Sequence, residues 1–274
     1  MTSQPARAAS LHQPILLREM LGSVAVLTLN RPEARNSLSE GLIAELDAAL
    51  REIHDDAKVR AVVIAANGPA FSAGHDMKEL TARRADADRG RAYFAEIMTA
   101  CSAMMQAIVH LPKPVVAAVQ GVATAAGCQL VASCDLAVGS EAATFATPGV
   151  DIGLFCSTPM VALSRNVPRK HAMEMLLTGE PISAATARDI GLINRVVAVG
   201  AERDAAIALA QKVALKSAYT IEIGKAAFYR QAEMSLAGAY RYAAEVMTEN
   251  MMARDAEEGI GAFIEKREPK WQDK

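Results

Sequence analysis

The sequence has few aromatic residues and almost no excess charge of either sign. Aromatic residues make up 4% of the 274-residue chain, and the formal net charge at pH 7 is −2. Because 29 Lys and Arg residues are balanced by 31 Asp and Glu residues, no overall positive field attracts a nucleic acid. No uncharged apolar run approaches the roughly 20 residues that cross a bilayer. A nucleic-acid partner and a membrane span are therefore not expected. The 51% hydrophobic content also excludes disorder as the main state.

Common catalytic signatures are absent as well. The chain has no P-loop, no dinucleotide-binding G-x-G-x-x-G, no G-x-S-x-G and no H-E-x-x-H. Its five histidines lie far apart, so we expect no bound metal and no cofactor. The four cysteines form no C-x-x-C pair and lie in apolar surroundings, which predicts reduced thiols in a core. They are Cys101, Cys128, Cys134 and Cys156.

The N-terminus carries no apolar segment of the kind found in secretory signals. Residues 1–13 are small and polar and include Arg7, so we expect a flexible leader there. The expected location is the cytoplasm of a bacterial-type cell, or the mitochondrial matrix if the source is a eukaryote.

Apolar segments of strand length alternate with helical patterns up to about residue 150. The hairpin 14–19 and 24–30 is expected to turn at 21–23, and helices are expected from 37–40, over 90–110 and from 125–127. Further strands are expected at 60–66, 115–119 and 135–139. From Pro159 onward the pattern is helical except at 192–198. An α/β core followed by a helical C-terminal portion is therefore predicted, with 78–91 as a solvated loop and helix face.

Two segments share an unusual order of an apolar strand, small residues and a helix start. They are 71–78 and 121–129. The first amides of a helix lack acceptors, and small residues let a ligand oxygen reach them. Two such helix ends facing each other would hold one carbonyl oxygen and stabilise an oxyanion. Tight packing of strand against helix is the alternative explanation.

Four motifs in a fixed order resemble the enoyl-CoA hydratase/isomerase (crotonase) family. They are Asn30-Arg-Pro-Glu-Ala-Arg-Asn-Ser-Leu38, Phe71-Ser-Ala-Gly-His-Asp-Met-Lys-Glu79, Lys113-Pro-Val-Val-Ala-Ala-Val-Gln-Gly121 and Thr178-Gly-Glu-Pro-Ile-Ser183. The resemblance implies an α/β, ClpP-like spiral of ββα units over 14–200. It also implies a helical C-terminal trimerisation region over 201–274, packing on the core and on neighbouring subunits in homotrimers or dimers of trimers.

The same resemblance implies a site for an acyl-CoA thioester. The backbone amides of His75 and Ala126 would form the oxyanion hole. Residues expected to bind the substrate are Arg35, Ser37, Asp76, Met77 and Lys78, together with Phe263 and Lys266 from a neighbouring subunit. A surface ion pair is the alternative role for Arg35, and a solvated helix end is the alternative for Lys266.

Both glutamates of typical hydratases are replaced. Gln129 and Gly149 stand where the resemblance places those carboxylates. An amide can position a water by hydrogen bonds but cannot take its proton, and each lost acid or base costs roughly 10²–10⁴-fold in rate. We therefore expect an acyl-CoA-binding protein of the hydratase/isomerase type that stabilises a thioester enolate. The alternatives are an inactive acyl-CoA-binding or regulatory protein and a thioester hydrolase.

Other side chains are possible substitutes for the missing carboxylates. The His75 imidazole titrates near neutral pH. Asp151 is a further candidate base, with a turn or capping role as the alternative. Cys156 and Ser157 are nucleophiles in principle, but the sequence positions no base beside them.

Overall fold

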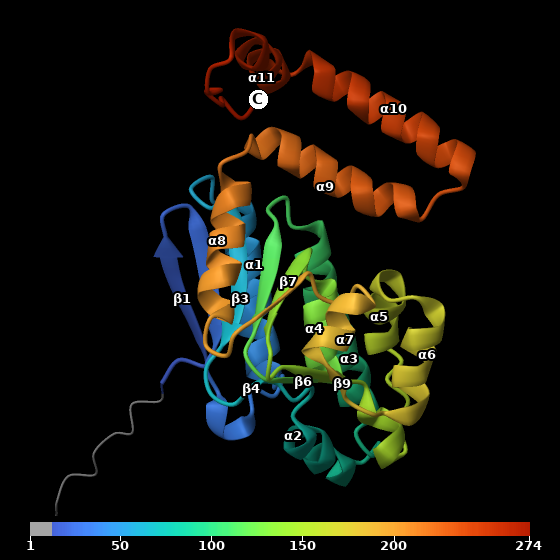
Figure 1. The fold of residues 1–274 in the computed structure, drawn as a ribbon. Helices are drawn as coiled ribbons and strands as arrows, with labels where there is room; N and C mark the ends of the chain where they lie inside the picture. Colours follow the sequence, from blue (N-terminus) through green and yellow to red (C-terminus); the bar gives the residue numbers. More distant parts are fainter. Residues whose placement is uncertain (1–12) are drawn as a thin grey trace, which may run out of the picture.

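Two sheets form the core of the protein (Figure 1). The computed structural model describes residues 13–274, so nearly all of the expected leader 1–13 lies outside the described residues. The larger sheet has the order β1-β2-β3-β5-β7-β10 and the smaller one β4-β6-β8-β9. The larger sheet contains β1 (Leu16–Leu21), β2 (Val24–Leu29), β3 (Ala61–Ala66), β5 (Val115–Val119), β7 (Leu136–Ser140) and β10 (Arg195–Val197). The smaller sheet contains β4 (Ala70–Ser72), β6 (Val122–Thr124), β8 (Thr144–Ala146) and β9 (Ile182–Ser183).

Successive turns of the chain each place one strand in each sheet before a helical segment. Strands β3 and β4 precede α2 and α3, β5 and β6 precede α4, and β7 and β8 precede η3 and α5. Neighbouring strands from successive turns pair in parallel in both sheets. This is the α/β spiral of ββα units that the resemblance implies, so the expected fold is confirmed. The helices before Pro159 are η1 (Pro32–Ala34), α1 (Glu40–Asp55), α2 (Met77–Ala82), η2 (Arg83–Ala85), α3 (Arg91–His110), α4 (Ala126–Ser133) and η3 (Pro148–Ile152).

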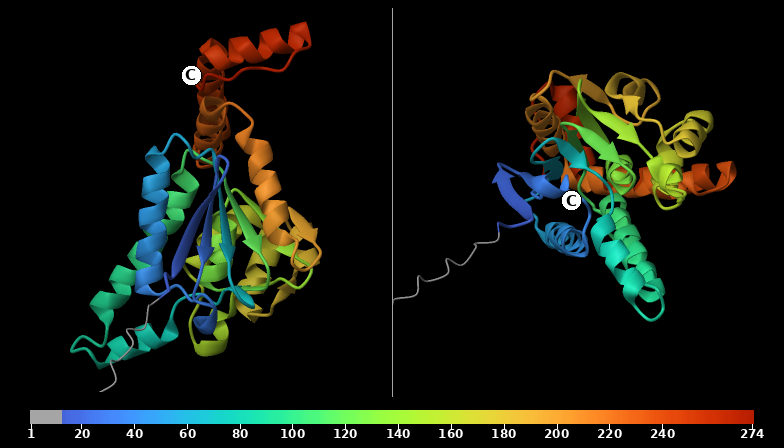
Figure 2. Two further views of the ribbon diagram at one scale, coloured as in Figure 1. Left: turned by 90° about the vertical axis from the view of Figure 1, so that its left-hand side faces the viewer. Right: turned by 90° about the horizontal axis from the view of Figure 1, so that it is seen from below.

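The two faces of the larger sheet are covered by different helices (Figure 2). Successive side chains of a strand point to opposite faces, and Leu27 and Ile64 accordingly join the buried cluster that includes α1 and α3. Their neighbours Val26 and Val63 instead face the small residues of α8. Such strands are buried on both sides, which explains their uninterrupted apolar sequences.

The chain after Pro159 is helical, as predicted, apart from β9 and β10. Its helices are α5 (Pro159–Asn166), α6 (Arg169–Thr178), α7 (Ala184–Asp189), α8 (Glu202–Ala214), α9 (Ala218–Ala232), α10 (Leu236–Met252) and α11 (Arg254–Glu265). Helix α8 packs on the core sheet, whereas α9, α10 and α11 extend beyond one end of it (Figures 1 and 2). In α9 and α10 no residue is buried.

A partly buried polar cluster, which we call the α9 anchor, attaches α9 to the core. The Lys225 ammonium donates to Asp135 Oδ2 at 2.7 Å and to the carbonyls of Ile108 and Lys113 at 3.0 and 3.1 Å. The other Asp135 oxygen accepts a bond of 2.9 Å from the Tyr229 hydroxyl. Burial lowers the pKa of Lys225, while the Asp135 carboxylate opposes that shift.

Three local expectations need correction. The first strand runs over Leu16–Leu21 instead of 14–19, because Leu21 still pairs with Val24 and only Gly22 and Ser23 form the turn. Gly22 has φ +63°, as such two-residue hairpin loops require. The strand expected at 135–139 is shifted by one residue, since the Asp135 side chain accepts the amide of Val115. The short strands of the smaller sheet were not predicted from the residue pattern, because two or three residues are too few to show a period.

Helix α3 is long and apolar enough to cross a bilayer by length and composition alone. One of its faces belongs to the core, through Ile97, Cys101, Met104, Met105 and Ile108. No other helix in residues 13–274 passes the same test. Residues 81–89, which lie within the charged segment 78–91, are all exposed, as expected.

Candidate functional site

The segments after β4 and β6 lie against each other at one edge of the smaller sheet. Gly74 has φ +85°, and a Cβ there would lie 2.9 Å from Ala125 Cβ and 3.3 Å from the Ala126 nitrogen. A Cβ on Gly127 would lie 2.2 Å from the Ser72 carbonyl oxygen. Glycine at these two positions therefore permits the close approach of the two backbones.

This approach places two unpaired backbone amides side by side. Leu38 forms a parallel bridge with His75, using the Gly74 carbonyl and the Asp76 amide. The His75 amide is not part of that bridge and donates no backbone hydrogen bond within residues 13–274. Ala126 is the first residue of α4, so its amide has no acceptor within the helix. The pair can hold one carbonyl oxygen and stabilise negative charge on it.

The structure corrects one part of the expected arrangement. Only the Ala126 amide belongs to a helix N-terminus. His75 precedes α2 by two residues, and the first amides of α2, those of Lys78 and Glu79, point to the Asp76 carboxylate at 3.1 and 3.5 Å. Helix α2 is thus capped by its own chain, and the second donor comes from an extended segment.

Ala125, between the two segments, has a strained backbone. Its φ of +49° and ψ of −118° lie in a region that residues other than glycine rarely adopt. Such a conformation costs on the order of 1–3 kcal/mol and persists where the surrounding structure enforces it. Here the Ala125 amide bonds to the Ala146 carbonyl at 2.9 Å, and its carbonyl accepts the Gln129 amide at 3.0 Å. The strain fixes the direction of the adjacent Ala126 amide.

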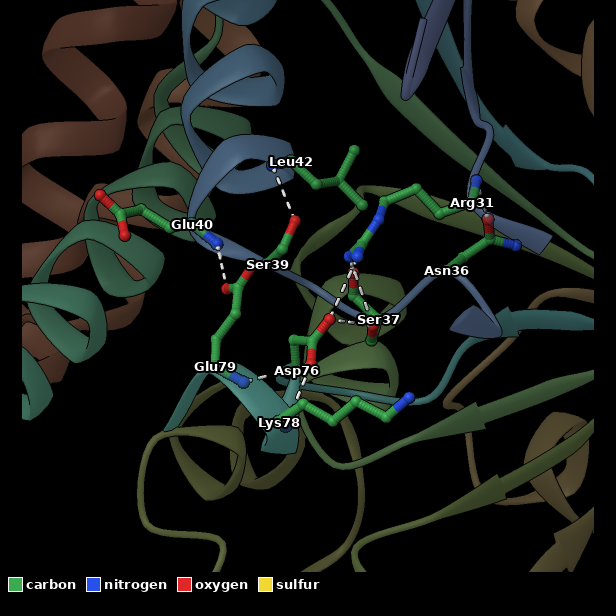
Figure 3. Close-up of polar contacts among 9 residues, drawn as sticks. All are labelled: Arg31, Asn36, Ser37, Ser39, Glu40, Leu42, Asp76, Lys78 and Glu79. Atoms are coloured by element: carbon green, nitrogen blue, oxygen red, sulfur yellow. Dashed lines mark hydrogen bonds and ion pairs between the residues drawn. The ribbon is translucent and has the colours of Figure 1, made fainter. Parts of the chain in front are cut away.

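Ser37 and Asp76, both expected to bind substrate, bond to Arg31 (Figure 3). Arg31 lies 3.1 Å from Asp76 Oδ2, and the Ser37 hydroxyl donates to the same oxygen at 3.1 Å. Burial by itself would raise the pKa of Asp76, but the bonds from Arg31, Lys78, Ser37 and Glu79 outweigh it and hold that pKa below its usual value. Arg31 was not among the residues predicted from the sequence, although its position in the first motif was an available signal.

Arg35 and Asn36 both have positive φ, of +51° and +50°. The Arg35 carbonyl accepts the Ala73 amide at 3.0 Å, which holds the loop near the two donors. The Arg35 side chain is exposed and forms no ion pair within the described residues, so the alternative of a surface ion pair is not realised. Asn36 is fully buried and its amide donates to the carbonyls of Asn67 and Ala70, each at 2.8 Å.

The remaining expected substrate-binding residues are exposed. Met77 and Lys78 lie on the first turn of α2, with 46% of Met77 exposed. Phe263, 83% exposed, and Lys266 lie at the end of α11. Helices α2 and α11 are at opposite ends of the molecule in Figure 1. Within one chain, therefore, the structure does not bring Phe263 and Lys266 to the other site residues.

Three side chains near the two amides have buried polar atoms without a hydrogen-bond partner within the described residues. These atoms are both ring nitrogens of His75, Oε1 of Gln129 and Oγ1 of Thr147. Gln129 is 5% exposed and Thr147 1% exposed. A buried polar group without a partner is costly, so these atoms are available for hydrogen bonds to a ligand. The sequence analysis identified Gln129 and His75 but missed Thr147, because a lone threonine carries no pattern.

The loop at Gly149 has no space for a side chain. A Cβ there would lie 2.9 Å from the Leu154 carbonyl oxygen and 3.0 Å from Cys156 Sγ. The structure therefore leaves no room for a longer side chain at position 149. Asp151 is exposed, and its carboxylate lies against Gly179 at the end of α6.

The other candidate reactive groups are poorly activated. Burial lowers the pKa of His75, and the nearby Leu38 carbonyl opposes this shift only in part. The imidazole is therefore neutral at neutral pH. All four cysteines are buried and free, as expected. Burial raises the pKa of Cys156, and that of Cys128 to about 12, which keeps both as thiols. The Ser157 hydroxyl bonds only to the Phe155 carbonyl, at 3.3 Å. In residues 13–274 no group of three metal-ligating side chains occurs.

Comparisons with known proteins cover nearly the whole chain. The family description "Enoyl-CoA hydratase/isomerase" matches residues 19–274. A mitochondrial enoyl-CoA hydratase domain-containing protein 3 from Xenopus laevis is 45% identical over 260 residues, 95% of this chain and 87% of the relative. The crystal structure of the human protein of that name superposes with a TM-score of 0.89 at 45% identity, covering 94% of this chain and 100% of the other. An enoyl-CoA hydratase structure from Mycobacterium smegmatis gives 0.89 at 50% identity, covering 94% and 99%.

Proposed function

The chain belongs to the enoyl-CoA hydratase/isomerase family, and from this premise we propose that it binds an acyl-CoA thioester and polarises its carbonyl group. The amides of His75 and Ala126 donate to the thioester oxygen and stabilise the enolate formed when a proton leaves the neighbouring carbon. The observation that carries the proposal is the pair of unpaired amides brought together at Gly74 and Gly127.

The residues at positions 129 and 149 limit the rate at which the protein can hydrate an enoyl thioester. Hydration of an enoyl thioester needs a base for the water and an acid for the α-carbon. Gln129 supplies neither, and the contacts around Gly149 exclude a carboxylate there. With the pKa of His75 lowered by burial, no charged acid replaces them. We therefore propose an acyl-CoA-binding protein of the lyase or isomerase type whose hydration of crotonyl-CoA is far slower than that of a carboxylate-bearing hydratase.

Calorimetry with acetyl-CoA and a crotonyl-CoA hydration assay test the two parts separately. We expect saturable binding of acetyl-CoA together with a hydration rate at least ~10²-fold below that of a conventional hydratase assayed in parallel. Hydration at an equal rate would contradict the second part. Absence of acetyl-CoA binding would contradict the first.

The variant Ala126→Pro tests the amide pair directly. Proline is tolerated at the first position of a helix but has no N–H to donate. We expect acetyl-CoA affinity to fall by about 10-fold or more. Arg169→Pro is the matched control, because Arg169 is the exposed first residue of α6 and follows Pro168, whose extended backbone suits a proline after it. Equal affinities in two folded variants would remove Ala126 from the site.

Assembly into a homotrimer or a dimer of trimers remains part of the proposal. Large apolar side chains on α9, α10 and α11 are exposed in the single chain, and they support an interface there. They include Phe228, Leu236, Tyr240, Met252, Phe263 and Ile264. Light scattering of the purified protein checks this, and a monomer would contradict both the trimer and the contribution of Phe263 and Lys266 to a neighbouring site.

A further inference from the structure

We propose that Arg31, Asp76 and Glu79 are positioning residues, which hold the His75 amide in the direction that a thioester oxygen requires. Together they join the start of α2 to the segment that leads into α1, and we call this set of contacts the α1–α2 clasp. The inference rests on the proposed function, because it takes the His75 amide as one of the two donors to an acyl-CoA.

The backbone around His75 has little support of its own. His75 lies between β4 and α2 and belongs to neither element. The Leu38 amide donates to the Gly74 carbonyl at 2.7 Å, and the Asp76 amide donates to the Leu38 carbonyl at 3.3 Å. The second distance is longer than the roughly 2.7–3.2 Å that is usual for such a bond. Side-chain contacts on the α2 side of His75 therefore decide how firmly its amide is held.

Asp76 connects α2 to the segment before α1 through both of its carboxylate oxygens. Oδ2 accepts from Arg31 Nη2 and from the Ser37 hydroxyl, each at 3.1 Å, while Oδ1 accepts two amides from the first turn of α2 (Figure 3). The Asp76 and Arg31 side chains are 12% and 18% exposed, so salt screens this ion pair less than a surface pair. The residue directly after His75 is thus fixed on two sides.

Glu79 makes a second contact, further along α2. Its Oε2 accepts the amide of Glu40 at 2.9 Å, and Glu40 is the first residue of α1. That amide has no acceptor within its own helix, and the dipole of α1 favours a carboxylate beside it. Figure 3 shows the carboxylates of Asp76 and Glu79 both reaching from α2 toward the segment 31–40. Helix α2 is therefore held at two points.

The segment that receives these contacts is itself fixed. Arg31 Nη1 donates to the Ser37 carbonyl at 2.8 Å, and the Arg31 amide donates to Asn36 Oδ1 at 2.8 Å. Asn36 is fully buried, and its own amide group donates to two carbonyls in the segment 67–70. The clasp thus fastens the His75 amide to a rigid support. A donor that is held in place in advance needs less ordering when a ligand binds.

Asp76 has no acceptor capacity left for a ligand. An ionised carboxylate offers about four lone-pair sites, and the bonds from Arg31, from Ser37 and from the two amides of α2 occupy them. Burial opposes ionisation of Asp76, but these bonds together hold its pKa below the usual value, so the carboxylate is charged at neutral pH. Asp76 therefore acts on a ligand through the neighbouring His75 amide.

Calorimetry with acetyl-CoA and S-ethyl-CoA tests the effect on the donor in the full-length protein. S-ethyl-CoA is a thioether of the same chain length that lacks the carbonyl oxygen. In Asp76→Asn the new side chain still caps α2 but has no charge for Arg31. We expect its acetyl-CoA affinity to fall by about 10-fold, with S-ethyl-CoA affinity changed less than about 2-fold. Glu79→Met keeps length and helix propensity but removes the acceptor, and should lower acetyl-CoA affinity alone by about 3-fold.

Two residues further along α1 provide matched controls. Asp47→Asn removes the charge from an ion pair with Arg51, about two turns beyond the start of the helix. Glu45→Met makes the other substitution at an exposed position of the same helix. Both controls should leave the affinities for acetyl-CoA and S-ethyl-CoA within about 2-fold of the wild type.

Amide hydrogen exchange in the ligand-free protein tests the clasp without any ligand. In Asp76→Asn and in Arg31→Met, the amides at positions 38 and 76 should exchange at least ~10-fold faster than in the wild type. The Val62 amide, which donates to the Pro114 carbonyl at 2.8 Å in the larger sheet, should keep its rate. Unchanged exchange at position 38 overturns the clasp. Equal acceleration at Val62 also overturns it, because the contacts then stabilise the whole fold instead of one segment.

The binding results separate this inference from the proposed function. An equal loss of affinity for both ligands in Asp76→Asn overturns the inference, because Asp76 then contacts the CoA part directly. Unchanged acetyl-CoA affinity in Asp76→Asn and Glu79→Met overturns it as well. Failure of the wild type to bind acetyl-CoA overturns the proposed function and the role of the clasp in binding, while the exchange rates still decide whether the clasp holds the His75 segment.

Discussion

Two largely buried polar clusters of this protein differ in whether their polar atoms have partners among the described residues. In the α9 anchor, Lys225, Asp135 and Tyr229 bond to one another and to nearby backbone groups. Beside the two free amides, His75, Gln129 and Thr147 have polar atoms with no partner; we call these three residues the site cluster.

The contrast shows what each cluster does. A satisfied buried network fixes one geometry, and the loss of one member leaves the others unpaired. The α9 anchor accordingly sets the position of a helix that otherwise has no buried residue. An unsatisfied cluster destabilises the free protein and gains its bonds only when a ligand supplies them. The site cluster adjoins the strained Ala125, which is a second cost of the same kind.

Breaking the α9 anchor should have the largest effect on stability. In Lys225→Met the Asp135 carboxylate stays buried without its counter-charge, which typically costs about 3–5 kcal/mol. We expect a loss of unfolding free energy of that order in chemical denaturation at fixed protein concentration. Lys212→Met, at an exposed position in the last turn of α8, is the control and should change stability by less than about 0.5 kcal/mol. Equal behaviour of the two variants would show that the anchor adds nothing.

A side chain at Gly149 should have the next largest effect. In Gly149→Ala the new Cβ would lie 2.9 Å from the Leu154 carbonyl oxygen and 3.0 Å from Cys156 Sγ. Overpacking of this kind costs about 1–3 kcal/mol. Gly224→Ala in α9 is the control, since nothing lies within 4 Å of its Cβ position and alanine favours a helix. A stabilised Gly149→Ala variant would mean that the loop readily accepts a side chain, and that the missing carboxylate could be restored.

Removal of a polar atom from the site cluster should stabilise the ligand-free protein. In Thr147→Val the unpaired hydroxyl is replaced by a methyl group of similar size, so we expect a gain of about 1 kcal/mol. Thr28→Val, which makes the same change at another buried threonine on β2, is the control. A clear loss of stability specific to Thr147→Val would show that its hydroxyl is satisfied, and the contrast between the two clusters would fail at this residue.

The smallest expected effect is a change in the pH dependence of stability. Burial holds the pKa of His75 below the usual value of 6.5, so the unfolded chain binds a proton in a range where the folded protein does not. Stability due to this residue is therefore present above about pH 6.5 and is lost as the pH falls from there toward the lowered pKa. In His75→Ala, the decrease of the melting temperature between pH 7 and pH 5 should be smaller. Unchanged slopes in the two proteins would show that His75 is freely protonated in the folded state.

Helices and strands with long sequence patterns were predicted more accurately than short ones. Long apolar strands and the 20-residue helix α3 were predicted nearly in place, because their periods repeat several times. The strands of the smaller sheet are two or three residues long and were missed by pattern. The motif containing His75 and Asp76 was recognised, but the pattern did not show that Asp76 caps α2 and pairs with Arg31.

The sequence by itself determined the family, the ββα spiral and the absence of a carboxylate at positions 129 and 149, because motif order and residue identity are local properties. Only the tertiary structure decided which polar groups have partners. Asp135 and Lys225 are 90 positions apart and bond to each other, whereas Gln129 Oε1 and Thr147 Oγ1 have no partner within the described residues. Hydrogen bonding depends on which distant segments the fold brings within about 3 Å of each other, and no local pattern encodes that distance.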